Sequence, residues 1–351
     1  MKKSFILLVF SIVFSSCKPI QVSNSTFFSS IKIDTLFKDK INIRAITVSP
    51  DNVWYAADKN RVGVINLKDS NKKEIQIYKD SLQLEFRSMA QTTDAIFVLN
   101  VGNPALLYKC SKDLNQKKMV YEEQHEKVFY DSMQFWNDQE GIAIGDPIDN
   151  CLSIIITRDG GEHWNKIPCN KLPKVMDGEA AFAASNTNIV IKGNTTWIVS
   201  GGKKSSVFYS PDKGVSWNFY DTPIIQGETM TGIFTADFYN DKIGFIAGGN
   251  YEKPNQNFQN KALTTDGGKT WILVGENQGF GYASCVQFVA NSNGEQLVSI
   301  GASGLFYSKD KGTTWKQLSS DSFLYTIRFV DNVTAIAAGK DKIVRIKFLS
   351  N

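Results

Sequence analysis

The stretch Thr264-Thr-Asp266-Gly-Gly268-Lys-Thr-Trp271 is one of four copies of the pattern Ser/Thr-x-Asp-x-Gly-x-x-Trp in this chain. An Asp carboxylate can accept hydrogen bonds from backbone N–H groups two or three residues further on, and Gly supplies a positive φ. The hydroxyl and the Trp ring would then tie down and cover the turn. Each copy therefore predicts a tight hairpin. The other three copies contain Asp159 and Trp164, Asp212 and Trp217, and Asp310 and Trp315.

The pattern resembles the Asp box of the bacterial neuraminidase repeat, which joins the two outer strands of a β-propeller blade. Four of the seven tryptophans are used in it, so it organises the fold. It indicates an architecture and says little about activity.

The chain divides into seven segments that each open with an apolar strand. They are roughly 42–52 residues long, the length of a four-stranded blade, and no long helical periodicity competes. The last segment ends early, and Ser30–Leu36 could supply its missing outermost strand, because an open edge is a liability. We therefore predict an all-β fold: a seven-bladed β-propeller over residues 30–351, closed by an N-terminal strand in the last blade. The segments open near Arg44, Phe86, Asp131, Gly178, Met230, Tyr282 and Tyr325.

The first residues are typical of a targeting signal. A short basic region precedes the apolar run Ser4–Phe14, which is too short to span a bilayer. Phe14-Ser-Ser-Cys17 then resembles the lipobox of bacterial lipoproteins. We expect a signal peptide over 1–16, lipidation of Cys17 and a tether over 17–29, which would anchor an exported protein in the bacterial envelope. An ordinary signal peptide is the alternative.

Charge and cysteine content exclude several classes of function. The formal net charge is +4, with two of the lysines in the leader, so nothing drives binding to nucleic acid. Beyond Cys17 there are four cysteines without a CxxC pair, and only two histidines; we expect no metal and no cofactor. Cys151 falls opposite Cys169 across the first hairpin. An exported protein could bridge them, and two unpaired thiols are the alternative.

With Asp boxes on a propeller, residues 40–348 resemble the photosystem II stability/assembly factor family, and more closely secreted propellers of that superfamily from bacteria without photosynthesis. The resemblance implies a scaffold or chaperone-like binding propeller, with no cofactor and no established catalytic residues. Four phrases carry it: Ala143–Pro147, Gly178–Asn186, Gly248–Tyr251 and Gly279–Ser284.

Alternating strand direction separates the two ends of a propeller. The four turns belong to one end, whereas the phrases above collect at the other, where innermost strands begin. Candidate binding residues should surround the channel mouth there. The structural alternative is that Arg44 and Arg87 pair with Asp131 or Glu179, and that the tyrosines only anchor loops. The candidates are Arg44, Arg87, Asp131, Asp146, Glu179, Tyr251 and Tyr282.

We expect a non-catalytic, monomeric propeller that binds a protein or peptide through this channel face. A sialidase-like glycan hydrolase, or a glycan-binding protein, is the alternative. A sialidase needs an arginine triad, a Tyr–Glu nucleophile pair and an acid/base Asp. Arg44, Arg87 and Arg328 would have to converge on one carboxylate, next to a paired Tyr and Glu. A redox enzyme is a third hypothesis, but the sequence contains no cofactor-binding motif that would support it.

Overall fold

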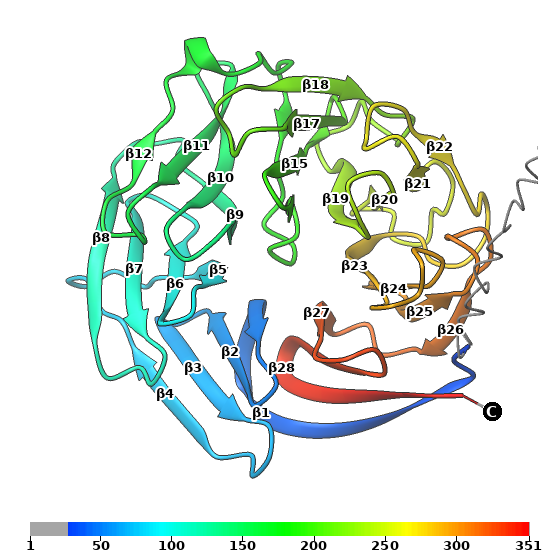
Figure 1. The fold of residues 1–351 in the computed structure, drawn as a ribbon, viewed down its shortest axis with the longest axis horizontal. Helices are drawn as coiled ribbons and strands as arrows, with labels where there is room; N and C mark the ends of the chain where they lie inside the picture. Colours follow the sequence, from blue (N-terminus) through cyan, green and yellow to red (C-terminus); the bar gives the residue numbers. More distant parts are fainter. Residues whose placement is uncertain (1–26, 351) are drawn as a thin grey trace, which may run out of the picture.

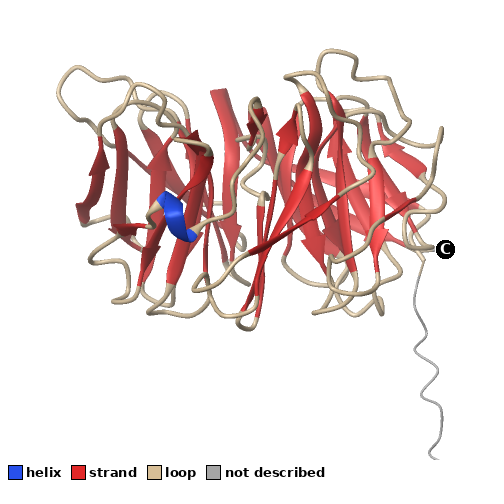
Figure 2. Ribbon diagram, turned by 90° about the horizontal axis from the view of Figure 1, so that it is seen from above, coloured by secondary structure: helices blue, strands red, loops and turns tan. Residues whose placement is uncertain are grey.

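The computed structural model describes residues 27–350, which form a ring of antiparallel sheets around a central axis (Figure 1). The strands run between two ends where the loops gather (Figure 2). One short helical element occurs in this range, the 3-10 helix η1 (Cys169–Lys171). The prediction of an all-β propeller is confirmed. None of the described residues belongs to a helix that could cross a membrane, and the leader, Cys17 and most of the expected tether lie outside the described range.

Four sheets have four strands each, paired in the orders β5-β6-β7-β8, β9-β10-β11-β12, β14-β15-β17-β18 and β23-β24-β25-β26. In chain order these strands are β5 (Phe86–Gln91), β6 (Ala95–Asn100), β7 (Ala105–Ser111), β8 (Lys117–Glu123), β9 (Tyr130–Phe135), β10 (Gly141–Ile148), β11 (Cys151–Thr157), β12 (Asn165–Lys166), β14 (Ile189–Lys192), β15 (Thr195–Val199), β17 (Ser206–Ser210), β18 (Asn218–Asp221), β23 (Ala283–Phe288), β24 (Leu297–Gly301), β25 (Gly304–Ser308) and β26 (Lys316–Ser319).

Two sheets have six strands each, in the orders β13-β16-β19-β20-β21-β22 and β27-β28-β1-β2-β3-β4. The first contains β13 (Glu179–Ala180), β16 (Gly201–Gly202), β19 (Thr231–Phe238), β20 (Gly244–Asn250), β21 (Lys261–Thr264) and β22 (Ile272–Leu273). The second contains β27 (Leu324–Phe329), β28 (Thr334–Leu349), β1 (Ser30–Val48), β2 (Asn52–Ala57), β3 (Arg61–Asn66) and β4 (Lys72–Gln76).

The prediction of seven blades is wrong, because the described residues form six sheets. The first and last expected blades are one sheet, built on β1 and β28. Each of these strands is long and bends at register shifts instead of ending at a turn, between Thr35 and Phe37 and again between Lys38 and Asn42. A bulge bends a strand while its pairing continues. Sequence segments that looked like separate blades therefore share one hydrogen-bonded sheet.

The two chain ends pair within this sheet. Ser30 lies opposite Leu349, and the pairing continues to Lys38 opposite Lys342. Just before the strand, the Phe28 ring packs 4.8 Å from the Phe348 ring, centroid to centroid. Strand pairing between the ends covers edges that would otherwise be open.

Residues 181–188, which we call the plug, fill the centre of the ring. They follow β13 and precede β14, they carry no regular secondary structure, and nearly all are buried. Asn186 illustrates the bonding: its Nδ2 donates to the Met89 carbonyl at 2.7 Å, and its Oδ1 accepts from Met133 N at 3.0 Å. The plug thus joins sheets on different sides of the axis. Residues of other segments that bond to the plug include Arg44, Met89, Met133, Asp146, Thr235, Ser284, Thr326 and Arg328.

The plug corrects one expected strand. Gly178–Phe182 was expected to open the innermost strand of its blade, but that strand is β14, which begins at Ile189. Glu179 and Ala180 instead pair with Gly202 and Gly201 of β16. The apolar, small-residue composition of this phrase fits the crowded channel as well as it fits a strand, so composition could not distinguish them.

The four Ser/Thr-x-Asp-x-Gly-x-x-Trp turns each connect the two outermost strands at one edge of a sheet, as expected. In the turn at Asp266, Thr264 Oγ1 donates to the carboxylate at 2.8 Å and accepts from Gly268 N at 2.9 Å. The carboxylate accepts from Lys269 N and Thr270 N, at 3.1 and 3.0 Å. The carboxylate therefore accepts from N–H groups three and four residues further on, whereas two and three residues were expected from the sequence.

The glycine that the pattern fixes two residues after the Asp also packs against the preceding sheet in each turn. Gly312 has a φ of +83°, and a Cβ on it would overlap the ring of Phe245 in β20. Gly268 meets Trp197 in the same way, with a Cβ position 3.1 Å from the indole Nε1. Glycine is therefore required twice, by backbone conformation and by lack of space.

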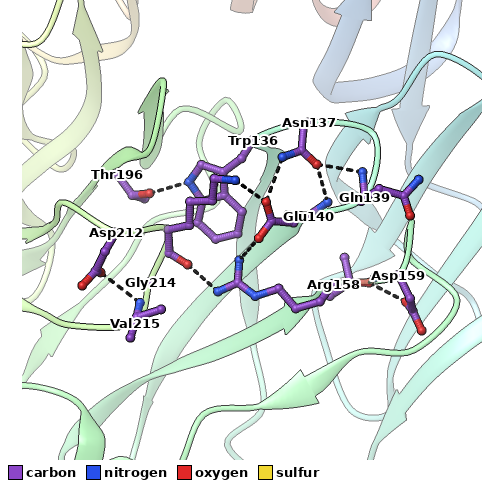
Figure 3. Close-up of polar contacts among 12 residues, drawn as sticks. Trp136, Asn137, Gln139, Glu140, Arg158, Asp159, Thr196, Asp212, Gly214 and Val215 are labelled. Carbon is purple, nitrogen blue, oxygen red and sulfur yellow. Dashed lines mark hydrogen bonds and ion pairs between the residues drawn. The ribbon is translucent and has the colours of Figure 1, made fainter.

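Neighbouring turns are also linked by charged side chains (Figure 3). Arg158, in the turn between β11 and β12, donates to Glu140 Oε1 and to the carbonyl of Lys213, each at 2.7 Å. Lys213 belongs to the next turn and itself pairs with Glu140. At these partly exposed positions the pairs contribute modestly to stability.

Cys151 and Cys169 form a disulfide, with Cα atoms 5.6 Å apart. It joins the start of β11 to η1, across the open end of the first turn's hairpin. Cys110 and Cys285 are buried free thiols.

We predict that Gly312→Ala destabilises the protein far more than Gly193→Ala. Both glycines have a positive φ, +83° and +58°, but a Cβ on Gly193 meets nothing within 4 Å. Gly193→Ala should lower the free energy of unfolding by about 1 kcal/mol, for backbone conformation alone, and Gly312→Ala by about 3 kcal/mol, because overpacking is added. Urea unfolding measures both, and equal losses would contradict the packing role.

Candidate functional site

The two ends of the ring differ in what they carry. The four turns lie at one end, which we call the turn end. At the other, the loop end, the innermost strands begin and the loops between second and third strands project. Arg87 and Asp131 lie next to such strand starts, Arg44 lies where the long strand β1 begins to pair with β2, and Tyr251 follows β20. The sequence-based separation of the two ends is consistent with this arrangement.

A hollow opens at the loop end beside the plug. Its larger compartment is a cavity of about 450 Å³ and its smaller one of about 350 Å³. Arg44, Tyr251 and Tyr282 line both compartments, which makes them neighbours. Arg87 and Asp146 line the larger one. A hollow of this size fits a short stretch of peptide or a small ligand.

Stacked aromatic rings form the floor of the hollow. Phe182 of the plug lies parallel to Phe234 of β19, with centroids 3.9 Å apart and an interplanar angle of 8°. Tyr282 meets Phe234 edge-on at 4.8 Å, and Tyr251 meets Tyr282 edge-on at 5.1 Å. Tyr251 is 48% exposed. The floor thus offers apolar area at the surface of a rigid support.

Neither arginine of the hollow forms an ion pair with an acidic residue among the candidates. Arg44 lies over the Tyr325 ring, 4.5 Å from its centroid, and donates to the plug carbonyl of Ala184 at 3.2 Å. Its Nε has no hydrogen-bond partner among the described residues. Arg87 pairs with Glu85 at 2.7 Å. No ion pair of the described residues joins either arginine to Asp131 or Glu179, so the proposed structural ring of charges is not formed.

Asp131 and Asp146 form an acidic corner at one side of the hollow. Asp146 Oδ1 accepts from the plug amide of Ala181 at 2.9 Å, and burial raises its pKa to about 6. Asp131 is completely buried, and neither of its oxygens has a hydrogen-bond partner in the described part of the chain. Burial first and the Asp146 charge second raise the pKa of Asp131 well above its usual range, while Arg87 opposes this rise.

Glu179 has a different environment from the other candidates. Its carboxylate accepts from Ser200 Oγ and from Met176 N, the latter at 3.0 Å. It is buried and stabilises the turn before β13. The structure therefore gathers Arg44, Arg87, Asp146, Tyr251 and Tyr282 around the hollow, places Asp131 beside Asp146, and gives Glu179 local partners.

Sequence reasoning missed Phe182, Phe234 and Tyr325, which complete the aromatic lining. Phe182 belongs to the phrase Gly178–Asn186, Phe234 follows the segment opening at Met230, and Tyr325 opens the last segment. An aromatic residue at such a position is equally typical of a buried core. One signal was available in the sequence. Aromatic residues recur near the starts of the segments, where Arg44 and Tyr282 had already been chosen as candidates.

The arrangement required of a sialidase is not present in the described residues. Arg328 donates to the plug carbonyls of Ser185 and Asn186, at 3.1 and 3.2 Å, and lines a different cavity at the turn end. It therefore does not join Arg44 and Arg87. In the described range no hydrogen bond joins Tyr251 to Glu252, and no group of three potential metal ligands occurs.

We predict that Asp146→Asn stabilises the protein at pH 7.5. Because the pKa rises from 3.8 to about 6 on folding, the folded state holds a proton between these pH values that the unfolded chain has lost. The free energy of unfolding should thus fall as the pH rises from about 4 to about 6, and it should stay lowered at higher pH because the buried carboxylate is then charged. Removing the charge should add about 1–2 kcal/mol to the free energy of unfolding at pH 7.5 and almost nothing at pH 4.

The exposed Asp177→Asn variant is the matched control and should change little at either pH. Loss of stability in Asp146→Asn at pH 7.5 would contradict the reading of this carboxylate as a strained group.

No protein-family model and no curated protein matches this chain. Several solved structures share its fold. "YCF48 bound to D1 peptide" is 12% identical with a TM-score of 0.63, over 93% of this chain and 98% of that one. The RRP9 WD40 repeats are 10% identical with a TM-score of 0.64, over 92% and 100% of the two chains. A GH74 xyloglucanase from Xanthomonas campestris is 11% identical with a TM-score of 0.66, over 89% of this chain and 53% of that one. Identities this low indicate a common β-propeller fold and leave the function to this chain's own residues.

Proposed function

We propose that this chain is a non-catalytic, monomeric propeller, lipid-anchored in the bacterial envelope, which binds a protein or peptide in the loop-end hollow. The observation that carries the proposal is the aromatic floor with Arg44 beside it, both held in place by contacts with the plug. Aromatic residues and arginine are the residue types that dominate binding energy at protein interfaces. A preformed, rigid site also reduces the entropy lost on binding.

The identification of the four turns as Asp boxes and the likeness to assembly-factor propellers belong to the same proposal. A peptide ligand is consistent with the solved structure of YCF48, which is described as bound to a D1 peptide. The fold does not decide the matter, because a xyloglucanase shares it. What favours binding over hydrolysis is the absence, within residues 27–350, of a converging arginine triad beside a Tyr–Glu pair.

The position of Phe27 supports a particular orientation for an anchored protein. Phe27 lies at the turn end, in a groove with Thr314 and Trp315 of the fourth turn. A lipid on Cys17 would therefore be tethered to the turn end, since fewer than a dozen residues separate the two positions and they reach at most about 35 Å. The loop-end hollow would then face away from the membrane, open to a partner.

Binding can be tested with peptides selected from a random library on the purified mature chain. We expect Tyr251→Ala and Arg87→Glu each to weaken the selected peptides at least tenfold in fluorescence polarisation, because both side chains line the hollow. Lys309→Glu, an exposed charge change at the turn end, should leave affinity unchanged. Peptides that bind all three variants alike would place binding elsewhere, and selective binding on a glycan array without any peptide would favour the glycan alternative.

The anchor has its own test. In cells labelled with a fatty-acid analogue, the wild-type chain should carry the label and sediment with membranes. Cys17→Ala should lose the label and the membrane association together, because no other described segment supplies a span. An unlabelled, soluble wild-type chain would refute the lipoprotein reading and leave the binding proposal intact.

A further inference from the structure

Asp131 is a buried carboxyl group for which the fold supplies no partner. It is 0% exposed, and both its oxygens lack hydrogen bonds. Leaving a buried carboxyl unsatisfied is costly. The same protein satisfies another deeply placed carboxylate: Asp237 accepts from Phe238 N at 2.9 Å and from Phe288 N at 2.7 Å. The missing partners therefore distinguish Asp131 from Asp237, another deeply placed carboxyl group.

The adjacent Asp146 extends the unpaired acidic group to the surface of the hollow. Its Oδ1 is bonded to Ala181 N, whereas Oδ2 accepts no hydrogen bond from the described residues. Asp146 lines the larger compartment and is close enough to raise the pKa of Asp131. Two carboxyl groups are thus neighbours, and one of them, that of Asp146, is accessible to a ligand in the cavity.

The surrounding charged groups do not neutralise this corner. Arg87 of β5 is paired with Glu85, and Arg44 of β1 lies on Tyr325 and the Ala184 carbonyl. Glu179 of β13 adds a further acid, bonded to Ser200. A cation that pairs with the acidic corner would have to come from outside the described chain.

The walls of the compartment suit an alkyl chain that ends in such a cation. Phe129, Phe182 and Met230 line the same cavity of about 450 Å³. Aromatic faces attract an ammonium group, and the three N–H donors of a primary ammonium match several carboxylate oxygens at once.

We propose that Asp146, with the buried Asp131 behind it, binds a primary ammonium group of the ligand, from a lysine side chain or from the N-terminus of a peptide. This inference rests on the proposed peptide-binding function and adds the chemistry that one part of the ligand must have. Arg44, which lines both compartments of the hollow, then lies near the following part of the peptide.

The test uses n-pentylamine as the probe and 1-pentanol as its uncharged analogue, with binding followed by NMR shifts of the mature protein. Pentylamine should bind the wild type at least tenfold more tightly than pentanol at pH 7.5. Asp146→Asn and Asp131→Asn should each weaken pentylamine at least tenfold, whereas Asp177→Asn should not. Because the Asn variants should be no less stable than the wild type, unfolding would not explain their loss of binding.

Two further probes distinguish the sources of the amine. Nα-acetyl-lysine methylamide presents only a side-chain ammonium, and glycyl-glycine amide presents only a terminal one; the tighter of the two identifies the source. Binding of pentylamine that is equal to pentanol, or that both Asn variants retain, would overturn the inference. Selected peptides whose affinity depends on Tyr251 but not on the two aspartates would also overturn the inference, while peptide binding itself would stand. If pentylamine binds through the aspartates but no peptide binds at all, the proposed function fails instead.

Discussion

Hydrogen bonding between the plug and the innermost strands is the constraint on which the rest of the structure depends. A ring of sheets has a central channel, and here residues 181–188 occupy it. Thr187 Oγ1 donates to Thr235 Oγ1 at 2.8 Å on one side of the axis, while Asn186 bonds to Met89 and Met133 on another. Buried polar groups need partners, so the irregular plug can stay in the channel only while the surrounding strands keep their positions.

The same plug builds the hollow from below. It supplies Phe182 to the aromatic floor, the Ala184 carbonyl to Arg44 and the Ala181 amide to Asp146. Site residues from different sheets are therefore positioned through one segment. A displacement of the plug would alter the floor, the arginine and the acidic corner together.

The local chemistry of the turns could be predicted from sequence, because a Ser/Thr, an Asp, a Gly and a Trp at fixed spacing form a self-contained hydrogen-bonded unit. The sheet count could not, since β1 and β28 continue past the point where a turn was expected and bend at bulges instead. The plug was also missed, because Gly178–Asn186 has the small and apolar residues of a buried strand. Its backbone pairs are replaced by side-chain bonds from distant residues such as Arg328, which no local pattern reveals.

For the site, sequence reasoning found residues at the loop end, because alternating strand direction fixes the end at which they lie. It did not find which groups are satisfied. Glu179 and Asp131 looked equivalent as acids at strand starts, yet Glu179 has Ser200 and Met176 as partners and Asp131 has none. That difference depends on three-dimensional contacts a few ångströms long. It is also the difference with functional meaning, because a fold made rigid by the plug can retain an unsatisfied carboxyl group that a looser fold would neutralise by rearrangement, and the stability lost there is of the kind that binding sites commonly carry.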